Sequence, residues 1–180
     1  ADATVCANAV PNMGLSFGNP QFGTWKHGSG AARWVVFLTS GYNNVPGVDG
    51  IDTGDGKGYL FIVDVATGAV LKTVGTNRGD TATPSGLAKI TAITADPTGV
   101  PLVTYIYGGD NLGQMWRFDL TATDGGVGVL KMGDAGVAQP ITTRPDVTLC
   151  AVDSGGAAQR VVLFGTGRLL DVPGTTTTDV

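Results

Sequence analysis

A strand, a turn and a second strand form a unit that occurs twice in full and once in part along this chain. The copies span residues 34–64, 102–119 and 160–167. A glycine closes the first apolar run of each copy, at Gly41, Gly109 and Gly167. Self-similarity at a regular interval indicates a repeat architecture. Because the repeated unit is a β-hairpin, the blades of a β-propeller are the leading interpretation.

Turn signals between the apolar runs extend each copy into a blade of four strands. We expect strands at residues 15–20, 33–40, 58–65 and 69–74, and again at 87–95, 102–107, 114–120 and 127–132. A third blade is expected to begin at 139–145 and to continue through 161–164. The sequence therefore predicts an all-β fold, a partial β-propeller of about two and a half four-stranded blades. The blade-like units are residues 15–76, 86–133 and 138–170 of a single propeller segment that spans 1–180.

Two and a half blades are too few to close a ring, because propellers typically have 4–8 blades. The chain is therefore expected to be a segment of a longer protein, or to pack as an open array or an oligomer. Unpaired strand edges would otherwise invite edge-to-edge pairing. No signal peptide is visible, which fits either a mature chain or a fragment.

The composition excludes several classes of protein. Charged residues make up 14% of the chain, whereas about 25% is usual, and the 29 glycines suit a β protein with many tight turns. The net charge of −4 and the lack of Lys/Arg clusters argue against a nucleic-acid partner. No apolar stretch approaches the roughly twenty residues of a membrane span. Cys6 and Cys150 either remain free thiols or form one disulfide, which an extracytoplasmic setting would favour.

One acidic loop is a candidate cation site. Asp49, Asp52 and Asp55 lie within seven residues, and glycines between them allow sharp turns, so they could surround a calcium ion. The alternative is a solvated loop in which Asp and Gly serve turn geometry. The alternative is favoured, because the spacing is not that of an EF-hand and no glutamate follows.

The other chemically suggestive residues have structural explanations. His27 is predicted to be a surface turn residue, since no nucleophile in a recognisable setting accompanies it. Ser40 and Ser85 lack the GxSxG frame of a nucleophile elbow. The glycine-rich loop at 108–113 precedes no expected helix, so hairpin geometry explains it better than phosphate binding.

Three aromatic residues are expected to be buried between blade sheets. Trp116 and Phe118 lie on one face of their strand, with Leu120, and Trp34 begins a strand of the preceding blade. Packing of these rings is a better explanation than stacking on a ligand.

Several stretches, in their order along the chain, resemble one known family. They are Gly14–Pro20, Phe37–Asn44, Thr83–Ala88, Tyr107–Asp119, Gln139–Pro145 and Val162–Arg168, and the Asp64–Gly68 turn resembles the quinoprotein-like propeller repeat. Together they look like the C-terminal β-propeller of the type IV pilus tip-associated adhesins, the PilC/PilY family. The resemblance implies a bacterial protein of the cell surface or pilus that supports pilus biogenesis and attachment. It implies as partners other pilus components, a surface receptor and the rest of the parent propeller.

The chain departs from this family at one loop. Many members carry a calcium loop of the DxDxDGxxD kind, and the corresponding stretch here is 96–104. Only Asp96 keeps a carboxylate, while Thr98, Val100 and Thr104 stand in place of the others. Calcium requires several carboxylates among its oxygen ligands, so this loop is expected to have lost calcium.

Three functional hypotheses follow. The first is a non-enzymatic segment of a type IV pilus tip-associated adhesin or biogenesis factor, without a cofactor other than a calcium ion. The second is a quinoprotein-like, cofactor-dependent enzyme, which is disfavoured because the chain has no adjacent-cysteine pair. The third is a structural module of a larger surface protein.

Overall fold

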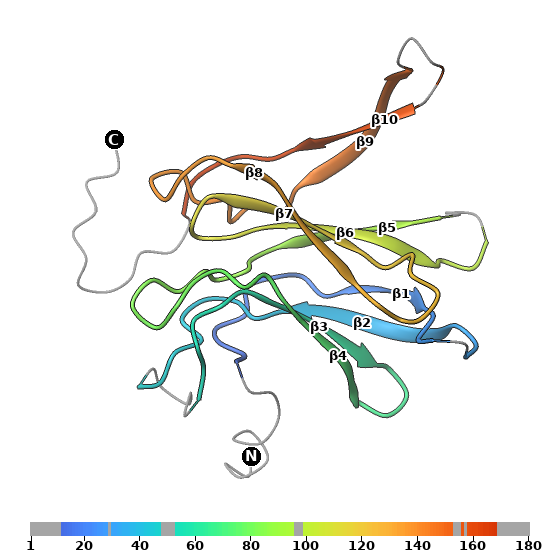
Figure 1. The fold of residues 1–180 in the computed structure, drawn as a ribbon, viewed down its shortest axis with the longest axis horizontal. Helices are drawn as coiled ribbons and strands as arrows, with labels where there is room; N and C mark the ends of the chain where they lie inside the picture. Colours follow the sequence, from blue (N-terminus) through green and yellow to red (C-terminus); the bar gives the residue numbers. More distant parts are fainter. Residues whose placement is uncertain are drawn as a thin grey trace.

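The computed structural model describes residues 12–28, 30–47, 53–95, 99–152, 156 and 158–168. These residues form strands and loops without a helix, as shown in Figure 1. The strands are β1 (Gln21–Trp25), β2 (Arg33–Thr39), β3 (Tyr59–Asp64), β4 (Val70–Gly75), β5 (Ile90–Thr94), β6 (Val103–Gly109), β7 (Gln114–Asp119), β8 (Gly128–Asp134), β9 (Asp146–Val152) and β10 (Ala158–Leu163).

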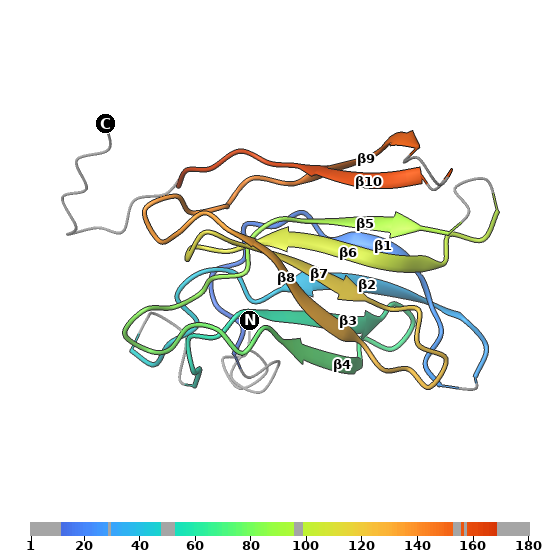
Figure 2. The same cartoon turned by 45° about the horizontal axis from the view of Figure 1, so that its top comes forward.

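The strands form three antiparallel sheets that are stacked in chain order (Figures 1 and 2). β1 to β4 form the first sheet, β5 to β8 form the second, and β9 pairs with β10 in the third. Within each four-stranded sheet the spatial order is the chain order. β1 contacts β5, and β5 contacts β9, so the first strands of the three sheets lie next to one another. This arrangement confirms the predicted all-β, partial-propeller fold.

The first hairpin illustrates how the sequence specifies a blade. Val35 and Phe37 of β2 are fully buried, while Val36 and Leu38 are only half-buried, which is the alternation of a strand with one face in a core. The turn after β3 is fixed by Asp64, whose Oδ1 accepts hydrogen bonds from the backbone N–H groups of Ala66 and Thr67. Gly68 completes the turn at a φ of 72°, where a side chain would be strained.

The main hydrophobic core lies between the first two sheets. The first sheet contributes Trp25, Val35, Phe37, Leu60, Ile62 and Val74. The second sheet and the segment before it contribute Leu87, Ile90, Val103, Ile106, Trp116, Phe118 and Leu120. Burial of these side chains against one another is what makes the two blades one unit.

Trp116 and Phe118 are buried as predicted, but the prediction for Trp34 is wrong. The Trp34 side chain is 56% exposed. Its partner in the ladder is Thr24, and both lie on the face of the first sheet opposite to the one that carries Val35 and Trp25. Trp25, which is 1% exposed, occupies the core position instead.

The first inner strand also lies later than predicted. Leu15 makes only an isolated bridge to Tyr42, and the strand begins at Gln21. Pro20 lacks a backbone N–H and so cannot donate to a strand ladder, whereas each residue of β1 has a partner in β2. The missed signal is the group Phe22, Thr24 and Trp25, residue types that are enriched in strands.

The third sheet contains a strand that the sequence analysis did not predict. β9 runs antiparallel to β10, and it begins directly after Pro145. The stretch predicted to start this blade, 139–145, is irregular and holds a single bridge, from Ile141 to Gly167. Two prolines in that stretch remove ladder donors.

The repeated glycines allow backbone segments from different parts of the chain to approach closely. A Cβ on Gly41 would lie 2.2 Å from the carbonyl oxygen of Leu15, and one on Gly109 would lie 2.2 Å from the Cγ2 atom of Ile141. Any other residue would clash at these two positions, so close packing explains two of the three repeated glycines. A Cβ on Gly167 would meet nothing within 4 Å, but its φ of 136° favours glycine.

Among the residues that the structure describes, no helix has the length and apolar character needed to cross a membrane.

Candidate functional site

Asp55 is the member of the predicted acidic loop that the structure describes, while Asp49, Asp52 and Asp96 lie outside the described residues. The Asp55 Oδ2 atom accepts hydrogen bonds from Lys57 Nζ at 2.8 Å and from the Tyr59 hydroxyl at 2.7 Å. Its Oδ1 atom accepts one from the Lys57 backbone N–H. Within the described ranges, no three His, Cys, Asp or Glu side chains gather in a way that could hold a metal ion.

These contacts shift the pKa of both side chains. Burial acts to raise the pKa of Asp55, but the hydrogen bonds from Lys57 and Tyr59 and the Lys57 charge outweigh it, so this pKa is lowered. Burial and the Asp55 carboxylate together raise the pKa of Tyr59 to about 12. The protonated Tyr59 is therefore favoured by folding. Its contribution to stability is complete below the ordinary tyrosine pKa of about 10 and is lost as the pH rises through about 12.

We expect Asp55→Asn to lower the pKa of Tyr59 from about 12 toward the ordinary value of about 10, because the substitution removes the negative charge beside the phenol. The measurement is an alkaline titration followed by the ultraviolet absorbance of phenolate. Tyr59→Phe identifies which part of the titration belongs to Tyr59. A Tyr59 transition that stays in place in Asp55→Asn would show that burial alone sets this pKa.

The structure also places the other residues that the sequence singled out. His27 is exposed beside a turn, with its ring centroid 5.1 Å from that of Trp25. Ser40 is fully buried, and its Oγ accepts a hydrogen bond from the Tyr59 backbone N–H. The loop at 108–113 is the β6–β7 hairpin turn, as predicted. Cys6 lies outside the described residues and the Cys150 side chain is not described, so their pairing remains open.

Asp110 is the centre of a buried polar cluster in that hairpin turn. The side chain is fully buried, and its Oδ2 atom accepts hydrogen bonds from Ser85 Oγ at 2.9 Å and Trp116 Nε1 at 2.8 Å. Its Oδ1 atom accepts from the backbone N–H groups of Leu112 and Gln114. Burial raises the pKa of Asp110 above its usual value, although the four donors act to lower it.

This Asp110 cluster connects three parts of the chain. Ser85 lies in the segment between the first and second sheets, and its backbone oxygen also accepts a hydrogen bond from the Asn111 N–H. The Asp110 backbone oxygen accepts one from the Ile141 N–H, in the segment between the second and third sheets. The cluster therefore ties both connections between blades to one turn, which is a structural role.

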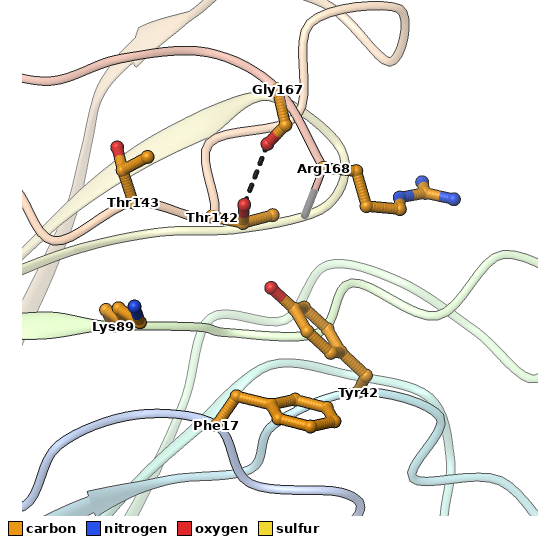
Figure 3. A pocket seen from close by; sticks show the side chains of 7 residues that line it. All are labelled: Phe17, Tyr42, Lys89, Thr142, Thr143, Gly167 and Arg168. Carbon is orange, nitrogen blue, oxygen red and sulfur yellow. Dashed lines mark hydrogen bonds between the residues drawn. The ribbon is translucent and has the colours of Figure 1, made fainter. Parts of the chain in front are cut away.

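A pocket of about 470 Å³ lies at the end of the sheets where loops from all three converge (Figure 3). Phe17 precedes β1 and Tyr42 follows β2, while Lys89 directly precedes β5. The third sheet contributes Thr142, before β9, and Arg168, after β10. In an antiparallel pair, the start of one strand lies beside the end of the next, so equivalent positions of the three blades meet here.

The pocket combines aromatic walls with positive charge. The Phe17 and Tyr42 ring centroids are 5.2 Å apart, with the rings tilted at 37°. No carboxylate lines the pocket, and among the described residues neither Lys89 nor Arg168 forms a salt bridge. Burial raises the pKa of Tyr42, although the Thr142 hydroxyl and the Arg168 charge act to lower it.

Neither the Asp110 cluster nor the pocket was predicted from the sequence. Their residues are drawn from segments far apart in the chain, and nothing in the local sequence marks Phe17 or Lys89 as neighbours. The repeated glycines were the one signal available, because Gly41 and Gly167 directly precede Tyr42 and Arg168.

Comparisons with a family model, with curated proteins and with solved structures all match this chain to the same kind of protein. The family model described as the PilY1 beta-propeller domain matches residues 2–128. A type IV pilus biogenesis factor PilY1 of Pseudomonas aeruginosa is 28% identical over 186 residues, which cover 89% of this chain and 14% of that protein. A type IV pilus biogenesis factor PilY1 homolog of Xylella fastidiosa is 27% identical over 179 residues, which cover 87% of this chain and 11% of that protein.

A solved structure agrees with these matches. The crystal structure of the Pseudomonas aeruginosa PilY1 C-terminal domain aligns with a TM-score of 0.63 and 27% sequence identity. The alignment covers 90% of this chain and 34% of the solved one. The chain thus spans a small part of the length of the relatives that it matches.

Proposed function

The chain belongs to the PilY1 β-propeller family, and from this premise we propose that it is a non-enzymatic propeller segment of a type IV pilus biogenesis factor. In this proposal it acts in pilus assembly and in attachment to surfaces. The proposal rests on the match of the family model over residues 2–128. That range includes the whole first sheet and the second sheet as far as the first residue of β8.

Two further observations support a pilus role. The two relatives compared above are described as a type IV pilus biogenesis factor and a homolog of one. The structural likeness also covers 90% of the chain. We propose that the protein is located at the bacterial surface or on the pilus. Its partners are pilus components or a surface receptor, together with the rest of the propeller.

The test is a deletion of the coding region for this chain in the bacterium that produces it. We expect fewer surface pili, measured as pilin sheared from cells, and weaker attachment to an abiotic surface. Immunoblotting of the parent protein establishes whether it is still made and exported. Normal piliation together with normal attachment would contradict the proposal.

A second strain separates assembly from attachment. In a strain that cannot retract its pili, pili that still form remain on the surface. If deletion of the segment leaves piliation intact there but attachment stays low, the segment acts in attachment itself. A purified chain with the visible absorbance of a bound quinone would instead favour the quinoprotein-like enzyme.

For calcium, we propose that the loop at 96–104 binds the ion weakly or not at all, since it keeps a single carboxylate, Asp96. If the chain holds a cation, the acidic loop of Asp49, Asp52 and Asp55 is the better set of ligands. We expect calorimetry to detect no micromolar calcium binding at 96–104. Micromolar affinity that survives replacement of all three aspartates of the acidic loop by alanine would contradict this assignment.

A further inference from the structure

We propose that the pocket between the three blades binds a small organic anion, in which a carboxylate is attached to a six-membered ring. The ring lies against Phe17 and Tyr42, and the carboxylate is held by Lys89. This inference goes beyond the proposed pilus function, and it rests on the walls, the charge and the size of the pocket.

The aromatic wall favours a ring-shaped ligand with an apolar face. The Phe17 side chain is 45% exposed although it lies against Tyr42 in a concave site, so a large apolar surface faces the pocket without a protein partner over it. Figure 3 shows the two rings on one side of the pocket and Thr142 on the opposite side. The volume of about 470 Å³ falls within the range of about 300–1,000 Å³ that small-molecule sites occupy. A ring placed on Phe17 would remove that surface from water.

The charge favours an anion. Lys89 and Arg168 lie on opposite sides of the aromatic pair (Figure 3), and no acidic side chain lines the pocket. This local excess of positive charge occurs in a chain with a net charge of −4, so the overall composition does not produce it. An ammonium group without a carboxylate partner is a strong donor for a ligand carboxylate.

The two cations contribute differently. The Arg168 guanidinium extends away from the rings in Figure 3, so it attracts an anion at longer range, where water and salt screen its charge. The Thr142 hydroxyl already donates to the Gly167 carbonyl oxygen at 2.7 Å and is therefore left as an acceptor. Lys89 is thus the direct partner of the carboxylate.

A ring that carries a carboxylate can come from two sources, a uronic acid sugar or an aromatic acid. Calorimetric titration of the full chain with glucuronate and with benzoate distinguishes them. The uncharged analogues glucose and benzamide measure the contribution of the carboxylate. We expect one of the two acids to bind at least about tenfold more tightly than its uncharged analogue, since one charge-assisted hydrogen bond is worth about that factor.

Variants test the residues. Lys89→Gln is expected to weaken binding about tenfold, whereas Lys26→Gln, which removes the same charge from an exposed position outside the pocket, leaves it unchanged. Phe17→Ala is expected to weaken binding, and Phe22→Ala, at a residue that is 63% exposed elsewhere, is its control. Phe17→Leu removes the ring but keeps most of the bulk, and thermal unfolding of each variant establishes that it is folded.

The results of the titrations and of the variants decide between these ligands and test the proposal itself. Binding of glucuronate alone identifies a sugar acid, and binding of benzoate alone identifies an aromatic acid. The proposal is overturned if neither acid binds at millimolar concentration, if the uncharged analogues bind equally well, or if Lys89→Gln and Lys26→Gln behave alike.

Discussion

Replacement of Trp116 by alanine is expected to lower the free energy of unfolding by about 3–5 kcal/mol, the usual cost of removing a large buried aromatic side chain. The Trp116 side chain is 4% exposed and belongs to the core between the first two sheets. Its indole N–H also donates to Asp110 Oδ2 at 2.8 Å, so the substitution removes a buried hydrogen bond together with the ring. The measurement is chemical denaturation of the variant and the parent chain.

Trp34→Ala is the matched control, because it removes the same side chain from a position that is 56% exposed. Its effect is expected to be below about 0.5 kcal/mol, as at ordinary surface positions. Trp116→Phe keeps most of the packing but loses the indole N–H, and we expect it to lower the free energy of unfolding by about 1–3 kcal/mol. A loss below about 0.5 kcal/mol for Trp116→Ala would place this ring in a binding surface instead of the core.

The sequence could predict Trp116 because the evidence for its burial is local. Apolar side chains alternate with mainly polar ones along β7, and this period identifies a strand with one face in a core. The same reasoning located most of the strands of the two four-stranded sheets. The repeated glycines have a different cause at two positions, because Leu15 approaches Gly41 closely and Ile141 approaches Gly109 closely.

Trp34 shows the limit of that reasoning. Alternation states that Trp34 and Val35 lie on opposite faces of β2, but it does not state which face meets the second sheet. In the structure the face that carries Val35 and Phe37 lies in the core, and Trp34 lies on the other face.

The pocket could not be predicted for a related reason. It is assembled from loop residues of three blades, and their proximity follows from the stacking of the sheets. Asp49, Asp52 and Asp96 lie outside the described residues, so the expectations for the two acidic loops remain predictions. Cys6 also lies outside them, and its pairing with Cys150 likewise stays open.

The second large effect on stability is expected at Asp110, because its carboxylate accepts four hydrogen bonds at once. We expect Asp110→Ala to lower the free energy of unfolding by about 3 kcal/mol or more, since each buried donor left without an acceptor costs about 1–3 kcal/mol. Two of these donors, Ser85 Oγ and Trp116 Nε1, are buried side-chain groups that both bind Oδ2. Asp110→Asn keeps the shape but offers a donor where one oxygen accepted, so it is expected to recover only part of the loss.

Asp80→Ala is the control for Asp110→Ala. Asp80 also accepts hydrogen bonds from a turn, from the backbone N–H groups of Ala82 and Thr83 and from the Thr83 hydroxyl, but it is exposed. Water can replace these bonds, so its loss is expected to cost less than about 1 kcal/mol. Trp116→Phe combined with Asp110→Asn should cost less than the sum of the two single changes, because both remove the same hydrogen bond. Strict additivity, or equal losses for Asp110→Ala and Asp80→Ala, would mean that the Asp110 cluster does not hold the two connections between the blades together.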